Sequence, residues 1–281
     1  MSANIMYYCV VECDKDEYLG NEIINNYNLK NFRYQKSLFE HIKFYRDGYE
    51  IFGYKFKLIF GYDKNELLSE ITKDKTAYYF VKLPESISKD ENKKDEAFGF
   101  VRKNNKEELK NSDHFSCGSC ELFFDKLNGV VLINKRGSIK MGSIIKDYIL
   151  ALSYFKKIQE FQTKAIEIKK PHFWRYIKNF NLCEYCCQRK KWNNFVKDLE
   201  FFEMNQYFSN PIMLNAYQSY NMWKFIYKNF NLEGYHNDML RQRANILKDN
   251  RTHEVATKAY FWAAASAIIG LISLMHSVFG S

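Results

Sequence analysis

Apolar and polar positions alternate along much of the first half of the chain, a pattern typical of half-buried β-strands. Residues 54–60 read Tyr-Lys-Phe-Lys-Leu-Ile-Phe, with large apolar side chains at every second position. The β-branched and aromatic stretches Ile5–Cys13, Thr76–Leu83 and Ala97–Arg102 predict three more strands. Leu38–Tyr45 predicts a short amphipathic helix.

The periodicity changes to that of helices after residue 143. Val130–Asn134 and Ser138–Gly142 first predict a hairpin, and an apolar stripe with helical spacing then runs from Ser143 to Lys170. Further helices are expected over His172–Phe180, Glu184–Phe202, Asn215–Phe230 and Asn237–Lys258. Strands followed by helices predict an α+β fold, β-rich in the N-terminal half and helical in the C-terminal half.

The last helical stretch continues into an uncharged segment. Ala259–Phe279 holds no Asp, Glu, Lys or Arg, and as a helix it would be about 31 Å long, which matches the hydrocarbon core of a bilayer. Tyr260 and Trp262 lie at its start, as in an aromatic belt. This pattern predicts a single transmembrane helix, with a buried core helix as the alternative.

Basic residues precede this segment and set the predicted orientation. They are Arg241, Arg243, Lys248, Arg251 and Lys258. Positive charge next to a membrane helix favours the cytoplasmic side. We therefore expect a single-pass protein of the plasma (inner) membrane whose N-terminal body is cytoplasmic.

Small residues in the same segment recur with alternating spacings of three and four. The predicted packing positions are Ala259, Ala263, Ser266, Gly270, Ser273 and Ser277. This spacing places all of them on one helix face, where small side chains let two backbones approach closely. The pattern predicts self-association into a homo-oligomer through this helix; an anchor that does not oligomerise is the alternative.

The net charge of +9 is unevenly distributed along the 281 residues. Residues 1–113 carry 19 basic and 20 acidic side chains, whereas residues 114–281 carry 23 and 13. The basic half, with aromatic and basic residues interleaved at His172–Tyr176 and Gln188–Trp192, is compatible with binding to anionic lipid or nucleic acid. A solvated basic surface is the alternative.

Two cysteine pairs are the most specific chemical motif. Cys117 and Cys120 form one Cys-x2-Cys pair, and Cys183 and Cys186 form the other. Four thiolates can hold one tetrahedral zinc ion, so the spacing predicts a structural zinc site, with His114 or Cys187 as possible substitute ligands. A redox-active pair and buried thiols without metal are the two alternatives.

No catalytic motif accompanies these features. The chain lacks a phosphate-binding glycine loop, a nucleophile elbow, a paired-histidine metalloprotease helix and a kinase signature. An enzyme built from dispersed residues stays possible, but the motifs do not favour one.

These observations predict four regions: a β-rich cytoplasmic region over 1–113, a Cys-pair and helical region over 114–236, a basic juxtamembrane helix over 237–258, and a transmembrane helix over 259–279. The leading hypothesis is a membrane-anchored effector or regulator, in its strongest form an antiviral abortive-infection effector that perturbs the membrane, with an operon-encoded partner. The alternative is a membrane-tethered, zinc-ribbon-like nucleic-acid-binding protein.

Overall fold

The structure is a computed structural model of the whole chain. It describes residues 4–14, 16, 19, 41–71, 75–102, 113–117, 120–125, 128–134, 140–167, 182–207, 211–212 and 217–279. Contacts divide the chain into two compact units. Unit 1 consists of Met1–Gln159 and Phe201–Glu233, and unit 2 of Glu160–Glu200 and Gly234–Ser281.

An eight-stranded sheet organises unit 1. Its strands lie in the order β2-β3-β4-β1-β5-β8-β7-β6, and within this sheet only β5 and β8 pair in parallel. The bounds are β1 Met6–Cys13, β2 Ile42–Tyr45, β3 Gly48–Ile51, β4 Tyr54–Gly61, β5 Ala77–Pro84, β6 Asp113–Cys117, β7 Cys120–Asp125 and β8 Gly129–Asn134.

Successive side chains of a strand point to opposite sides of the sheet. In the central strands, the side chains on both sides are buried. On one face, Tyr79, Val81 and Leu83 of β5 join a core with Ala97, Phe98 and Val101. These last residues belong to α3 (Glu91–Val101), and α1 (Lys64–Ser69) and α2 (Glu85–Ser88) lie on the same face.

The opposite face of the sheet is covered by α5 (Met141–Glu167) and α8 (Tyr217–Asn229). Tyr148 of α5 is fully buried, with its ring 5.0 Å from Phe80 and 5.5 Å from Phe124. Trp223 of α8 is also fully buried, and its ring centroid lies 6.3 Å from that of Tyr154. This aromatic layer is the second core of unit 1.

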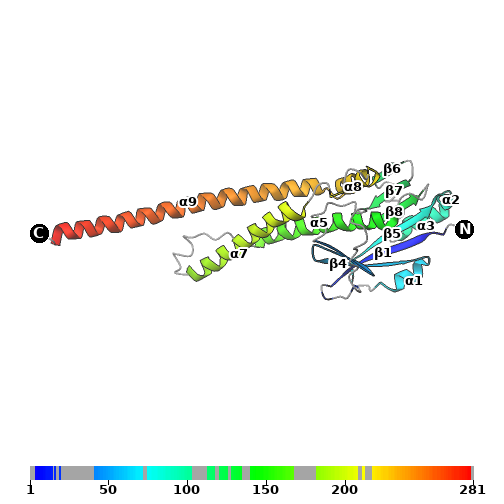
Figure 1. The fold of residues 1–281 in the computed structure, drawn as a ribbon, viewed down its shortest axis with the longest axis horizontal. Coiled ribbons are helices and arrows are strands. Elements are labelled where there is room, and N and C mark those ends of the chain that lie inside the picture. Colours follow the sequence, from blue (N-terminus) through cyan, green and yellow to red (C-terminus); the bar gives the residue numbers. More distant parts are fainter. Residues whose placement is uncertain are drawn as a thin grey trace. The chain divides into compact units, whose positions relative to one another are not determined.

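Unit 2 is entirely helical in its described residues. It holds the end of α5, α7 (Leu182–Phe201) as far as Glu200, and almost all of α9 (Leu232–Phe279). Phe161, Trp192, Phe195 and Leu199 are buried here, with the rings of Phe161 and Phe195 6.1 Å apart. Helix α9, drawn in orange to red in Figure 1, has 48 residues and is about 72 Å long.

The α+β prediction is confirmed, but several local predictions are wrong. Residues 97–101 end α3 and form no strand, and Ile42–Tyr45 is strand β2 and not part of a helix. Met141 and Gly142 belong to α5, and the described neighbours of β8 are β5 and β7, so the predicted hairpin strand Ser138–Gly142 is wrong where it is described. The predicted helix over 172–180 lies outside the described residues.

Two further parts of the predicted fold class are also wrong. Among the residues that the structure describes, no helix has the length and apolar character needed to cross a membrane. In the same residues, no three side chains of His, Cys, Asp or Glu come together as a metal site, so the described part of the fold contains no zinc knuckle.

Candidate functional site

The final stretch of α9 carries the densest group of exposed large apolar side chains described in the chain. Phe261 is 70% exposed, Trp262 69% and Ile269 64%. Tyr260, Ile268, Leu271 and Ile272 are exposed as well. Monomeric proteins rarely expose a contiguous apolar patch of this kind, and such patches mark interaction sites. We call residues 259–273 the apolar end of α9.

The small residues of the apolar end are also exposed to solvent. Ala259, Ala263, Ser266, Gly270 and Ser273 are exposed, whereas the side chain of Ser277 lies outside the described residues. A methyl group added at Gly270 would meet no atom within 4 Å. At 100° per residue these positions share one face, and Phe261, Ile268 and Ile272 share the opposite one. The apolar end therefore has a shallow face and a protruding face.

The apolar end corrects the predicted membrane anchor. Since no helix in the described part of the chain could cross a bilayer, the predicted single-pass transmembrane helix and inner-membrane location are wrong. The physical reason is composition, because Ala, Ser and Gly occupy many positions between Ala259 and Ser273 and dilute the apolar surface. The antiviral membrane-perturbing hypothesis depended on that helix, and nothing else supports it.

The basic residues before the apolar end are only partly described. Arg241, Lys248 and Lys258 are exposed, and Arg241 forms an ion pair of 3.8 Å with Asp238. The side chains of Arg243 and Arg251 lie outside the described residues. Because no helix in the described residues could cross a membrane, the predicted role of these charges in setting a membrane orientation no longer applies.

The four predicted zinc ligands are divided between the two units. Cys117 and Cys120 lie at the facing ends of β6 and β7 in unit 1, whereas Cys183 and Cys186 begin α7 in unit 2. Cys120 is buried, and the side chains of Cys117, Cys183 and Cys186 lie outside the described residues. Zinc binding by these four residues stays a prediction.

Neither predicted substitute ligand lies in a described group of metal-binding side chains. His114 is exposed and stacks on Phe123, with the ring centroids 4.7 Å apart. Cys187 is exposed on α7. A stacked imidazole at the sheet edge is explained by packing, so His114 needs no metal to account for its position.

The basic surface of α7 stays a candidate for nucleic-acid contact, with one change. Arg189, Lys190 and Lys191 are exposed, but Trp192 is buried. Its ring centroid lies 5.9 Å from that of Phe195. Trp192 is therefore a core residue of unit 2 and cannot stack on a base. The second interleaved stretch, residues 172–176, lies outside the described residues.

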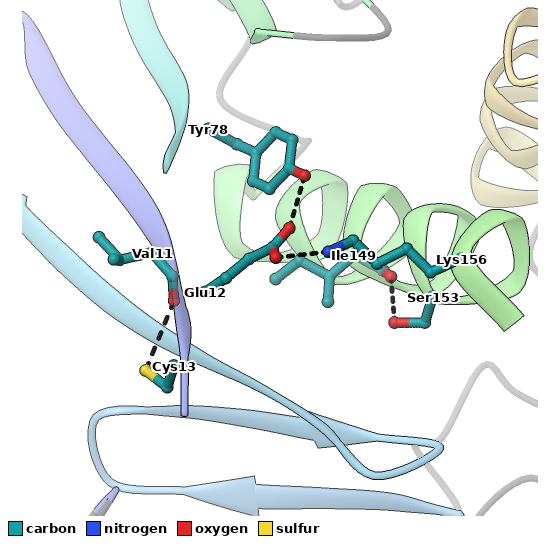
Figure 2. A network of polar contacts seen from close by, with 7 residues as sticks. All are labelled: Val11, Glu12, Cys13, Tyr78, Ile149, Ser153 and Lys156. Carbon is teal, nitrogen blue, oxygen red and sulfur yellow. Dashed lines mark hydrogen bonds and ion pairs between the residues drawn. The ribbon is translucent and has the colours of Figure 1, made fainter. Parts of the chain in front are cut away.

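A polar network that the sequence analysis did not single out joins the sheet of unit 1 to α5. Figure 2 shows Tyr78 of β5 and Lys156 of α5 both directed at the carboxylate of Glu12 in β1. Tyr78 Oη donates to Glu12 Oε1 at 2.6 Å, and Lys156 Nζ forms an ion pair with Oε2. Burial, together with this carboxylate, raises the pKa of Tyr78 far above its usual value. The one charged residue inside the apolar stretch of β1 was the available signal.

Asp125 holds a second buried network at the end of β7. It forms an ion pair with Nε of Arg102 and accepts hydrogen bonds of 3.1 Å from the backbone and side-chain nitrogens of Asn128. The next residue, Gly129, has φ +143, and a methyl group there would lie 1.7 Å from the carbonyl oxygen of Tyr79. Gly129 thus allows β8 to lie directly against β5, which is a structural role.

Two unusual backbone features, a non-glycine residue with positive φ and a short π-helix, pack against α5. Phe52, in the β3–β4 turn, has φ +53, which costs about 1–2 kcal/mol for a residue with a side chain. Its ring packs 5.1 Å from Tyr154 and 6.2 Å from Phe202, the first residue of the π-helix Phe202–Gln206. Gln206 Nε2 lies 3.4 Å from Nδ1 of His41. Aromatic packing offsets the strain, and Gly53, which follows with φ +83, was the available turn signal in the sequence.

A cavity of about 10 Å³ lies on the α5 side of β2 and β3. It is lined by Ile42, Phe44, Tyr49, Ile51, Lys146 and Leu150. Lys146 Nζ stands 4.4 Å from the ring centroid of Phe44. This space could hold at most one water molecule, so it is not a substrate site.

No protein-family model and no curated protein matches this chain. The apolar end of α9 is therefore the best candidate functional site on its physical properties alone.

Proposed function

We propose that this protein is a self-assembling regulator, in which unit 1 is the recognition body and the apolar end of α9 joins several copies. The observation that carries the proposal is the exposure of Phe261, Trp262 and Ile269 in the apolar end of α9. An exposed apolar patch of this kind marks a surface to which another molecule binds.

A second copy of the chain is the occupant that fits the apolar end best. Its shallow face, with Gly270 at the centre, matches the side chains of Phe261, Ile268 and Ile272 on the protruding face. Because these are two different surfaces, the contact is heterologous, and such contacts join three or more copies into a ring or an open filament. A two-fold dimer would leave one face of each helix in water.

Sedimentation equilibrium of the full chain tests this proposal. We expect the wild type to behave as a trimer or larger assembly, and Gly270→Leu to weaken the association at least about tenfold, because the new side chain fills the shallow face. Leucine favours a helix more than glycine does, so a loss of assembly could not be attributed to a broken helix.

Ala244→Leu is the matched control, since it adds a leucine at an exposed position of α9 outside the apolar end. This variant should assemble like the wild type. A monomeric wild type at all concentrations, or normal assembly of Gly270→Leu, would contradict the proposal. So would a monomer that binds lipid vesicles and does not self-associate.

A further inference from the structure

The exposed side of α7 carries four cations that form no ion pair with any other described residue. They are Arg189, Lys190, Lys191 and Lys197. Residues 187–197 hold no Asp or Glu, and Asp198 is the first carboxylate that follows them. The cations are therefore available to an anionic partner. We call the exposed side chains of residues 187–197 the basic face of α7.

Helix geometry arranges the basic face in a middle row and two flanks. At about 100° per residue, the middle row consists of Lys190, Asn193, Asn194 and Lys197, all of them exposed. Arg189 and Lys191 lie about 100° to either side of Lys190, one on each flank. Ammonium and amide groups thus fill the middle of the basic face, and one cation stands on each side of it.

The buried side of α7 argues against two kinds of anionic partner. Trp192, Phe195 and Leu199 are buried in unit 2. These apolar side chains are therefore not free to enter a bilayer, as those of an interfacial amphipathic helix must. No exposed residue of the basic face is aromatic, so unpaired bases find no ring on which to stack. A lipid surface and a single-stranded nucleic acid are thus poorer fits than a nucleic-acid duplex.

We propose that the basic face of α7 is a binding site for duplex DNA, with the helix lying in the major groove. That groove is about 12 Å wide and admits an α-helix, whereas the major groove of an RNA duplex is narrow and deep. Arg189 and Lys191 then face the phosphates on the two sides of the groove. The middle row faces the base edges, to which ammonium and amide groups donate hydrogen bonds. This inference goes beyond self-assembly through α9 and does not depend on it.

The test is fluorescence anisotropy of the full chain with a labelled DNA duplex of about 20 base pairs, which is two helical turns. Binding should weaken steeply between about 50 and 200 mM NaCl, because each phosphate contact releases counterions. The double variant Arg189→Gln/Lys191→Gln should weaken binding at least about tenfold and reduce the slope of log affinity against log salt by about 2. Glutamine is a good helix former, so the circular dichroism of this variant should match that of the wild type.

The matched control is Lys57→Gln/Lys93→Gln, which removes the same charge from two exposed lysines of unit 1. It should keep the salt slope of the wild type and its affinity within about twofold, because distant exposed charges are screened. Arg189→Lys/Lys191→Arg keeps both charges and should bind like the wild type. An equal loss of affinity in the control, or no binding at about 50 mM NaCl, would overturn the proposal. So would single-stranded DNA or an RNA duplex that binds as tightly as duplex DNA.

Discussion

Trp223 and Trp262 lie in neighbouring helices along the chain, yet the first is fully buried and the second is 69% exposed. Trp223 belongs to the aromatic core of unit 1, with Tyr154 and Tyr227 beside it. Trp262 belongs to α9 of unit 2, where only the Phe261 ring is described near it, at 6.3 Å.

The contrast extends to the two units as wholes. Unit 1 buries aromatic side chains on both faces of its sheet and pairs the carboxylates of Glu12 and Asp125 with cations. Unit 2 buries a small cluster near Trp192 and leaves the apolar end of α9 exposed. The apolar surface of unit 1 is thus used for stability, whereas that of unit 2 is available for binding.

The largest expected effect comes from exchanging each tryptophan for alanine. Trp223→Ala should lower the free energy of unfolding by about 3–5 kcal/mol, because it leaves a cavity in a packed core. Trp262→Ala should change it by no more than about 0.5 kcal/mol under conditions in which the chain is monomeric. Urea unfolding followed by circular dichroism measures both; equal effects would refute the contrast between the two units.

An intermediate effect is expected for ion pairs. Asp125→Ala removes the buried partner of Arg102 and should cost about 3 kcal/mol, since breaking a buried pair leaves a charge poorly solvated. Lys164→Ala removes an exposed partner of Glu160, four residues away on α5, and should cost at most about 0.5 kcal/mol. The same unfolding measurement applies, and a cost below about 1 kcal/mol for Asp125→Ala would show that its network is not structural.

The smallest expected effect is a pH dependence in unit 2. Burial lowers the pKa of His236 below its usual value of about 6.5. The folded state therefore disfavours protonation, so this residue's contribution is complete above about pH 6.5 and is lost as the pH falls toward the lower folded pKa. His236→Gln should reduce the loss of stability between about pH 7.5 and 5.5. An unchanged pH profile in that variant would contradict the shift.

The pattern of the sequence predicted part of the fold correctly. Strands β1, β4, β5 and β8 and helices α5, α7, α8 and α9 all follow regular spacing of apolar residues. The short apolar run Ala97–Val101 is compatible with a strand or a helix, and its helix is determined by the Asp90 side chain, which accepts hydrogen bonds from the backbone nitrogens of Asn92 and Lys93. Strands β6 and β7 have weaker patterns and form through pairing.

The candidate site, like the fold, could be predicted from the sequence only in part. The sequence identified the apolar end of α9 and the cysteine pairs, because composition and spacing are local properties. It could not give the exposure of Trp262 or the burial of Trp192, since both depend on which helices pack together. It also could not show that Tyr78 and Lys156, separated by 78 residues along the chain, meet at Glu12.

By itself, the sequence determined the α+β class, the long C-terminal helix and the uneven charge, because each depends on residues close together in the chain. Only the tertiary structure decided the strand order, the opposition of Cys117 and Cys120, and the burial of Trp223 in contrast to Trp262. The physical reason is that burial and pairing depend on contacts between distant segments, and the free energy of those contacts is not contained in any local pattern.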